Sequence, residues 1–243
     1  MSHSSSGLNV LIPACGVGRR FYEAGYSTIK PLIDVAMAPM VQHVIDSFRG
    51  SNCTVFLPSG DATSLGRTLL DGARVVGLTP GQCHMGAVQT ILAGADYCDW
   101  DAPVFVVNSD NVICPDGGWE DIQRGWLRSG CSAAIVLFEE TRDGPYSWAG
   151  PVPSIRHIAE KAKISDYACA GAFWFKSYAL LHTAATVHLA GAPDIGKEYY
   201  VAPMISRVLK AGGVVGSLVL DSDDMFVRIG VPEDIPLAEQ RLL

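Results

Sequence analysis

The first 138 residues alternate between short apolar runs and segments with helical spacing. Four runs are rich in β-branched residues and have the length of buried strands: LNVLIP (8–13), CTVFLP (53–58), ARVVGL (73–78) and PVFVVNSD (103–110). Between them, DATSLGRTLLDG (61–72) and HMGAVQTILAGADY (84–97) repeat their apolar positions with the period of a helix, and Asp61 is the expected cap of the first. This alternation predicts a mostly parallel sheet with helices on both faces.

The pattern changes after about residue 140, where Gly and Pro become frequent. Three later segments read as strands of a more antiparallel lobe: SIRHIAEK (154–161), CAGAFWFK (169–176) and VVGSLVLD (214–221). We therefore expect an α/β fold, a Rossmann-like three-layer sandwich with a mixed, mostly parallel central sheet and a smaller antiparallel lobe. The expected domain is a single unit over 8–243, divided into halves 8–138 and 139–243, after a flexible leader at 1–7.

Composition narrows the class of protein. The chain has 243 residues, of which 49% are hydrophobic, enough to bury a core without disulfides or structural metals. No apolar run approaches the roughly 18 to 20 residues that span a bilayer. The formal net charge is -7, which opposes a broad nucleic-acid footprint because phosphate backbones are bound by clustered Lys and Arg. We therefore expect neither a membrane nor a nucleic-acid partner.

The cysteines and the polar start of the chain bear on its compartment. The seven cysteines are scattered and mostly lie in apolar runs, with no C-x-x-C pair. Buried, reduced thiols are the expected state, and they indicate a reducing compartment. The segment MSHSSSG lacks the apolar stretch of a secretory signal. The expected location is cytoplasmic.

The strongest motif is IPACGVGRRF (12–21), followed by Lys30-Pro31. Gly16 and Gly18 would let backbone amides approach phosphate oxygens closely, and Arg20 and Lys30 add positive charge beside them. A tight strand-to-helix turn with incidental surface charges is the alternative for such a glycine pair alone. The dinucleotide fingerprint does not fit because Phe21 replaces its third glycine, and no Gly-Lys-Ser or Gly-Lys-Thr occurs.

These residues resemble the sugar-1-phosphate nucleotidyltransferases of GT-A-like fold, especially the capsule and lipopolysaccharide branch that opens with I-P-x-A-G-x-G-S-R-F and continues with K-P-L-I. The resemblance implies that the glycine loop cradles a triphosphate. It gives Arg20 and Lys30 catalytic roles at the phosphates. The loop residues that it implicates in nucleotide binding are Ala14, Gly16, Val17 and Gly18.

The resemblance extends to two further nucleotide-side segments. PGQCHMGAVQTILAG (80–94) is similar to the family's Q-x-x-G segment, which implies that Gln82 and Gly86 flank the base; a simple helix start is the alternative. Asn108 and Asp110 follow a predicted strand. The family binds its Mg²⁺ through an Asp at the position of Asp110, which becomes the expected catalytic metal ligand, with Asn108 binding nucleotide. A turn-forming Asp is the alternative there.

The second half carries the implied acceptor site. IAEKAKISDYACAGAFWF (158–175) resembles the family's E-K-x-x-I-S stretch, in which the Glu binds acceptor hydroxyls, the Lys binds the acceptor phosphate and the Gly passes close to the sugar. Those roles fall to Glu160, Lys161 and Gly171, with Trp148 placed nearby; an adjacent Glu-Lys is otherwise a solvated pair. In EYY (198–200), Glu198 or Tyr199 could also line the pocket.

The chain departs from the family pattern at several positions. Arg19 replaces a small Ser or Thr, and Cys15 replaces a small residue. Sugar-specific relatives often carry a second metal-binding Asp where Arg228 stands here. Three acidic residues are alternatives that spacing does not distinguish: Asp221, Asp223 and Asp224.

The resemblance implies an enzyme that transfers a nucleoside monophosphate from a nucleoside triphosphate to a phosphorylated acceptor, first of all a sugar 1-phosphate. It releases pyrophosphate and makes an activated sugar for surface polysaccharide synthesis. Three alternatives stay open: a cytidylyltransferase for a phosphorylated small alcohol, a glycosyltransferase of the same fold, and a catalytically silent sensing subunit, which Arg228 suggests. Relatives often form dimers, so a homodimer is an expected assembly.

Overall fold

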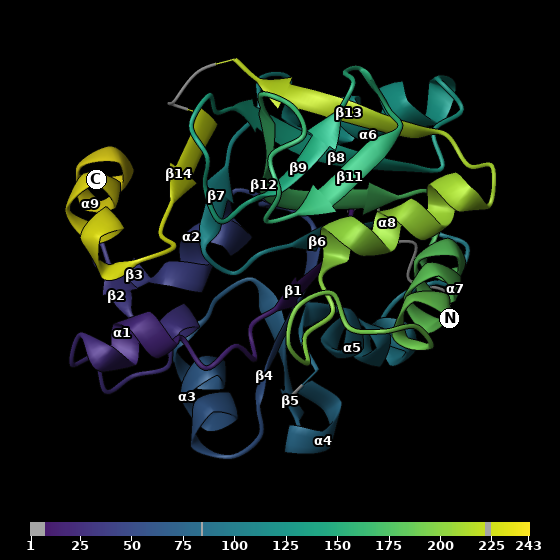
Figure 1. The fold of residues 1–243 in the computed structure, drawn as a ribbon. Helices are drawn as coiled ribbons and strands as arrows, with labels where there is room; N and C mark the ends of the chain where they lie inside the picture. Colours follow the sequence, from purple (N-terminus) through teal and green to yellow (C-terminus); the bar gives the residue numbers. More distant parts are fainter. Residues whose placement is uncertain (1–7, 84, 222–224) are drawn as a thin grey trace.

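A ten-stranded mixed sheet forms the centre of the protein in the computed structural model, which describes residues 8–83, 85–221 and 225–243 (Figure 1). Its parallel part is built on β1 (Asn9–Pro13), which pairs with β4 (Asn52–Pro58) and β6 (Val104–Val107). β4 pairs in turn with β5 (Ala73–Leu78), also in parallel. The four predicted strands are confirmed. β1, β4 and β6 are buried along most of their length, as suits strands covered on both faces, whereas β5 is an edge strand and is mostly half-buried.

The later strands continue the same sheet. β12 (Tyr167–Phe175) lies antiparallel between β6 and β8 (Ala133–Glu139), and β13 (Val215–Leu220) runs parallel to β8. Two strands, β9 (Ser147–Gly150) and β11 (His157–Glu160), pair with each other beside β12, and the short β10 (Ser154–Ile155) closes the edge at β13. The predicted mixed architecture is confirmed, and the antiparallel lobe shares the central sheet.

Helices cover both faces of this sheet, as predicted (Figure 1). The face that receives Val10 and Ile12 is covered by α2 (Met40–Asp46), α6 (Gly118–Arg128) and α9 (Ile235–Leu242). The opposite face, which receives Leu11, is covered by α5 (Ala87–Leu92), α7 (Tyr178–Leu189) and α8 (Val201–Lys210). The alternation of side chains along β1 thus divides the core into two layers. Within the described ranges, no helix has the length and apolar character needed to cross a bilayer.

The remaining elements are short and lie around the rim. The helical ones are α1 (Arg19–Glu23), α3 (Asp61–Leu69), α4 (Pro80–Cys83) and 3-10 turns at Lys30–Leu32, Ala93–Asp96 and Pro232–Asp234. Two small antiparallel sheets join β2 (Asp34–Val35) to β3 (Ala38–Pro39) and β7 (Asn111–Ile113) to β14 (Phe226–Arg228). The second sheet brings the chain just before residue 230 to the carboxyl end of β6.

Two local predictions are wrong. Asp61 is the first residue of α3, and the N-cap is Gly60, whose φ of 99° suits a glycine. The cysteines are free but not mostly buried: only Cys53 and Cys131 are buried, and Cys114 is exposed. The expected leader at 1–7 lies outside the described residues.

Candidate functional site

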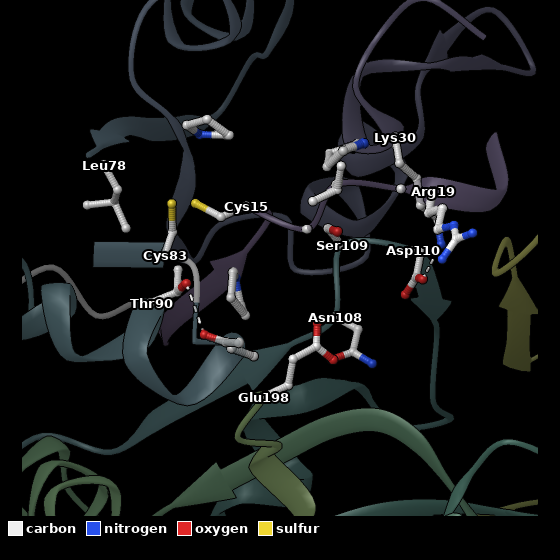
Figure 2. Close-up of a pocket in the computed structure, with 18 of the residues that line it drawn as sticks. Cys15, Arg19, Lys30, Leu78, Cys83, Thr90, Asn108, Ser109, Asp110 and Glu198 are labelled. Atoms are coloured by element: carbon white, nitrogen blue, oxygen red, sulfur yellow. Dashed lines mark hydrogen bonds and ion pairs between the residues drawn. The ribbon is translucent and has the colours of Figure 1, made fainter. Parts of the chain in front are cut away.

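A cleft of about 1000 Å³ opens at the carboxyl ends of the parallel strands (Figure 2). The loops that follow Pro13, Leu78 and Val107 all contribute to its lining, as expected for ligand sites in open α/β sheets. The antiparallel half closes the cleft with the segment Glu198–Tyr200. Pro58 and Ser59, at the end of β4, line the cleft as well, so the chain after all four parallel strands meets there.

The glycine loop has one position that sterically requires glycine and one that leaves open space. Gly18 has a φ of 62°, and a Cβ added there would lie 2.7 Å from the Cβ of Lys30. Gly16 is exposed, and a Cβ there would meet no atom within 4 Å. Val17 is also exposed, while buried Ala14 donates its backbone N–H to the oxygen of Phe56 at 2.9 Å. The loop is thus anchored at its base and open at its tip.

Lys30 and Asp110 form an ion pair inside the cleft. The Nζ of Lys30 lies 2.6 Å from Oδ2 of Asp110 and 3.1 Å from the backbone oxygen of Gly230. It also lies over the ring of Phe21, 5.1 Å from its centroid. The side chains are 14% and 25% exposed. One ammonium thereby connects the glycine loop, the end of β6 and the segment after β14.

The two arginines of the loop differ in their partners. Both line the cleft. Arg19 forms an exposed ion pair with Glu23, with 2.7 Å between Nε and Oε1. The side chain of Arg20 is exposed and has no hydrogen bond or ion pair to any residue in the described ranges. Its guanidinium is therefore available to a ligand in the cleft, whereas Arg19 is held along α1.

The predicted base-side residues lie in different settings. Gly86 lines the cleft with a φ of 92°, and a Cβ there would come within 2.8 Å of the backbone oxygen of Tyr199. Gly86 therefore permits the close approach of the two halves of the chain. Gln82 is exposed and does not line the cleft, and its Oε1 accepts hydrogen bonds from the N–H and hydroxyl of Thr79 at 3.0 and 2.9 Å.

Asn108 and Gly171 are packed together where β6 meets β12. The backbone N–H of Asn108 donates to the oxygen of Gly171 at 2.8 Å. Gly171 has a φ of 84°, and a Cβ there would lie 2.6 Å from Nδ2 of Asn108. The β12 pairing with β8 also shifts register around this glycine. Asn108 and Asp110 both line the cleft, so Gly171 supports the loop after β6 through its backbone.

The predicted acceptor residues Glu160 and Lys161 lie at the end of β11. Glu160 accepts a hydrogen bond from the hydroxyl of Ser147, and its burial raises its pKa, an effect that the hydroxyl partly opposes. Lys161 has its Nζ 3.2 Å from the hydroxyl of Tyr200 and 5.0 Å from the centre of that ring. Tyr200 donates in turn to Glu198 at 2.6 Å.

The Lys161–Tyr200–Glu198 network joins β11 to the cleft, and sequence reasoning did not find it. Tyr200 and Glu198 line the cleft, whereas Lys161 does not. Burial, followed by the hydrogen bond with Glu198, raises the pKa of the Tyr200 hydroxyl. The only available signal was the EYY motif, and its contact with β11 depends on long-range packing.

Trp148 lies in β9 and does not line the cleft. It is fully buried, and its indole Nε1 has no hydrogen-bond partner among the described residues. The ammonium of Lys163 lies 5.2 Å from its ring centroid. Trp148 therefore supports the lobe from within the core, at a distance from the cleft surface.

Arg228 is the last residue of β14 and pairs with Asn111 of β7, the residue that follows Asp110 in the chain. It donates to the hydroxyl of Tyr146, and its Nε lies 3.7 Å from Oδ2 of Asp234. Among the alternative acids, Asp221 is exposed after β13, while Asp223 and Asp224 lie outside the described residues. No cluster of three or more His, Cys, Asp or Glu side chains suited to a metal occurs in the described ranges.

The donor set around Asp110 fits Mg²⁺ that is shared with a substrate. Mg²⁺ is commonly held by one or two carboxylates together with substrate phosphates and water, without a complete protein cage. Asp110 supplies one carboxylate at the cleft surface, and the adjacent Asn108 supplies an amide. A metal brought in with a triphosphate would therefore find a protein ligand here.

Solved structures of similar fold include three nucleotidyltransferases, none above 19% identity. A nucleoside-diphosphate-sugar pyrophosphorylase from Vibrio cholerae RC9 has a TM-score of 0.80 and 19% identity, covering 95% of this chain and 99% of its own. The inositol-1-phosphate CTP transferase from T. maritima has a TM-score of 0.75 and 14% identity, and the match covers 97% of this chain and 95% of that structure. A putative glucose-1-phosphate thymidylyltransferase from Bacillus anthracis, in complex with a sucrose, has a TM-score of 0.76 and 16% identity. The match covers 96% of this chain and 94% of that structure. These likenesses establish the fold.

Sequence comparison establishes the family. No curated protein sequence matches the chain. Residues 10–175 match the MobA-like NTP transferase domain, which is more than half of the chain and includes the glycine loop, Lys30 and Asp110. The protein therefore belongs to the MobA-like NTP transferase domain family and is a nucleotidyltransferase.

Proposed function

We propose that this enzyme transfers a nucleoside monophosphate from a nucleoside triphosphate to a phosphorylated small acceptor, first of all a sugar 1-phosphate, and releases pyrophosphate. The observation that carries this proposal is the Lys30–Asp110 pair, which sits beside an open glycine loop in a cleft of about 1000 Å³. The three similar structures are named for a nucleoside-diphosphate sugar, inositol 1-phosphate and glucose 1-phosphate, which supports an acceptor of this class.

The loop and its cations suit the triphosphate. Gly16 leaves space at the loop tip, so a phosphate oxygen can approach backbone N–H groups. Arg20 has no competing partner among the described residues, and Lys30 is fixed by Asp110 and Gly230. The acceptor phosphate oxygen attacks the α-phosphorus in line. Because both reactants are anions, these residues promote the reaction by positioning and by neutralising charge, without a covalent intermediate.

Asp110 is the proposed protein ligand for a divalent ion, and enzymes of this family typically use one. When bound, Mg²⁺ supplies charge neutralisation at the phosphates. Asp110 is held for this role by the Nζ of Lys30 and by its own backbone oxygen, which accepts from the N–H of Ile229 at 2.9 Å. The same ion pair keeps Lys30 directed into the cleft.

The acceptor is proposed to lie between the cleft and the β9–β11 hairpin. Glu160 would accept hydrogen bonds from acceptor hydroxyls, and Lys161 would bind the acceptor phosphate after leaving the hydroxyl of Tyr200. Glu198 lines the intervening surface and offers a second carboxylate for hydroxyl groups. On the sequence resemblance alone, we place the activated sugar in capsule or lipopolysaccharide synthesis and the enzyme, as a homodimer, in the cytoplasm.

A two-dimensional pyrophosphate-release screen tests the proposal. The full chain with Mg²⁺ is assayed with CTP, UTP, dTTP, GTP and ATP, each against sugar 1-phosphates, inositol 1-phosphate and small phosphorylated alcohols. We expect pyrophosphate only when a matching nucleotide and acceptor are both present, with the nucleotidyl-linked product seen by mass spectrometry. Nucleotide binding without turnover across the panel would instead identify a sensing subunit, and release of nucleoside diphosphate from a nucleotide sugar would identify a glycosyltransferase.

A further inference from the structure

Two cysteines from distant parts of the chain meet inside the cleft. Cys15 lies in the glycine loop directly before Gly16, and Cys83 is the last residue of α4. Both line the cleft, and Figure 2 shows their sulfur atoms side by side. The Cys83 thiol is also among the causes of the raised pKa of the Cys15 thiol, so the two groups lie within interacting range. No other cysteine lines the cleft in the described ranges.

Weak contacts hold the two sulfurs in place. The Sγ of Cys15 donates to the backbone oxygen of Phe56 at 3.5 Å, and the Sγ of Cys83 donates to that of Thr79 at 3.3 Å. Because a thiol is a weak hydrogen-bond donor, these two contacts do not lock the side-chain torsions of the cysteines. Both residues are half-buried beside the open cleft, which gives a small reagent access to them.

The surroundings of the two cysteines determine which of them reacts first. Burial is the main cause that raises the pKa of the Cys15 thiol, and the neighbouring Cys83 adds to it, while the Thr90 hydroxyl acts in the opposite direction. Little Cys15 thiolate is therefore present to attack a reagent in solution. Cys15 therefore reacts best with a sulfur atom that is held next to it, and Cys83 carries such an atom.

We propose that Cys15 and Cys83 form a reversible disulfide site in the nucleotide cleft, oxidised by a low-molecular-weight disulfide such as glutathione disulfide. Cys83 loses its proton and attacks one sulfur of glutathione disulfide, forming a mixed disulfide and releasing one glutathione. Cys15 then loses its proton and attacks Sγ of Cys83, which breaks the mixed bond and releases the second glutathione. Two protein thiols are oxidised, one glutathione disulfide is reduced, and the two protons end on the released thiols.

The bridge would act on the loop that the proposed reaction uses. It would tie residue 15 to α4, next to Gly16, and place a covalent link across the space between the glycine loop and the base side of the cleft. Nucleotide affinity should therefore fall on oxidation. This consequence rests on the proposed function, but the formation of the disulfide does not.

The bridge itself is tested on the unmodified full chain. The protein is equilibrated across a series of glutathione redox ratios, its free thiols are alkylated, and its peptides are mapped by mass spectrometry. We expect a cross-linked pair of peptides joining Cys15 to Cys83 that disappears with dithiothreitol. The matched control Cys114→Ser, which removes the exposed cysteine outside the cleft, should keep the bridge. Alkylation of both Cys15 and Cys83 at every ratio, or a mixed disulfide that never resolves, would overturn the proposal.

The effect on the cleft is measured as the dissociation constant of the nucleotide that binds best to the reduced protein. We expect at least about tenfold weaker binding after oxidation. Oxidation should leave the nucleotide dissociation constant of the Cys83→Ser variant unchanged. Circular dichroism confirms that this variant is folded. Equal affinity in the reduced and bridged wild type would overturn the effect on the cleft. If the reduced protein binds no nucleotide while the bridge still forms, the proposed function fails and the disulfide site stands.

Discussion

At the scale of single residues, the site depends on one close backbone approach. Gly18 has a φ of 62° and faces the Cβ of Lys30, so any side chain there would be both strained and obstructed. That approach lets Lys30 reach Asp110, although the two residues are 80 positions apart in the chain. The sequence motif pointed to Lys30 through resemblance, but no spacing rule indicated this ion pair.

The two loop glycines should therefore respond differently to alanine. Gly18→Ala should lower the free energy of unfolding by about 1 to 3 kcal/mol because it combines a left-handed backbone with the contact to Lys30. Gly16→Ala, the matched control, should change it by less than about 0.5 kcal/mol because its added Cβ meets open space. Denaturant unfolding checks both values. Equal losses in the two variants would contradict the described loop conformation.

Two of the cations that line the cleft, Arg20 and Lys30, should be needed for turnover. Arg20→Ala or Lys30→Ala should reduce the rate constant by about a hundredfold or more, since each removes a positive group from the developing phosphate charge. Arg128→Ala, which removes an exposed arginine on α6 outside the cleft, is the control and should retain full activity. Pyrophosphate-release kinetics on purified, folded variants give the comparison. Near wild-type rates in the two cleft variants would remove the proposed mechanism.

The Glu160 carboxylate should lower the stability of the protein while it contributes to acceptor binding. Its pKa is raised in the folded state by burial, so the folded protein holds this proton more tightly than the unfolded chain does. The resulting stability is complete below the ordinary glutamate pKa and is lost as pH rises through the raised value. Glu160→Gln should therefore melt above the wild type at neutral pH and converge with it in acid.

Activity supplies the second half of that test. Glu160→Gln should raise KM for the acceptor while KM for the nucleotide stays near the wild-type value, because the carboxylate is proposed to bind acceptor hydroxyls only. A variant that melts below the wild type at every pH would show that the hydrogen bond from Ser147 outweighs the effect of burial.

At the scale of elements, the predictable parts were those with strong local patterns. β1, β4 and β6 are apolar runs that the sequence identifies directly, and in an open α/β sheet the loops after residues 13, 78 and 107 fall at one rim. Asp61 was expected as a cap, but Gly60 can adopt a φ of 99° and takes that position. The Lys161–Tyr200 contact and the Cys15–Cys83 pair could not be predicted because they depend on how distant segments pack.

The short helix α4 offers a test of Gln82. Its side chain bonds the N–H and hydroxyl of Thr79, as a cap does, rather than facing the cleft. Gln82→Ala should therefore lower the free energy of unfolding by about 1 kcal/mol. We expect the KM for nucleotide to change by less than about threefold. A large change in base preference would instead support the sequence-based prediction that Gln82 contacts the base.

At the scale of the whole molecule, an acidic chain collects positive groups at one cleft. The formal net charge is -7, yet Arg20 and Lys30 both line the same cleft, beside a carboxylate suited to a metal. The fold makes this possible because the central sheet continues from its parallel half into its antiparallel half. The elements that we propose to bind nucleotide and acceptor thus meet where β6 pairs with β12. Oligomeric contacts and the choice of base are set by surfaces and backbone contacts that carry no local sequence signal.

Tracing the phosphorus atoms through one turnover tests the central claim most directly. The enzyme is given its best nucleotide, labelled at either the α- or the γ-phosphate, together with the best acceptor and Mg²⁺. We predict that the α-label moves into the acceptor product while the γ-label leaves as pyrophosphate, and that both transfers are lost in Lys30→Ala. A γ-label on the acceptor, or an α-label that never leaves the nucleotide, would contradict nucleotidyl transfer at this cleft.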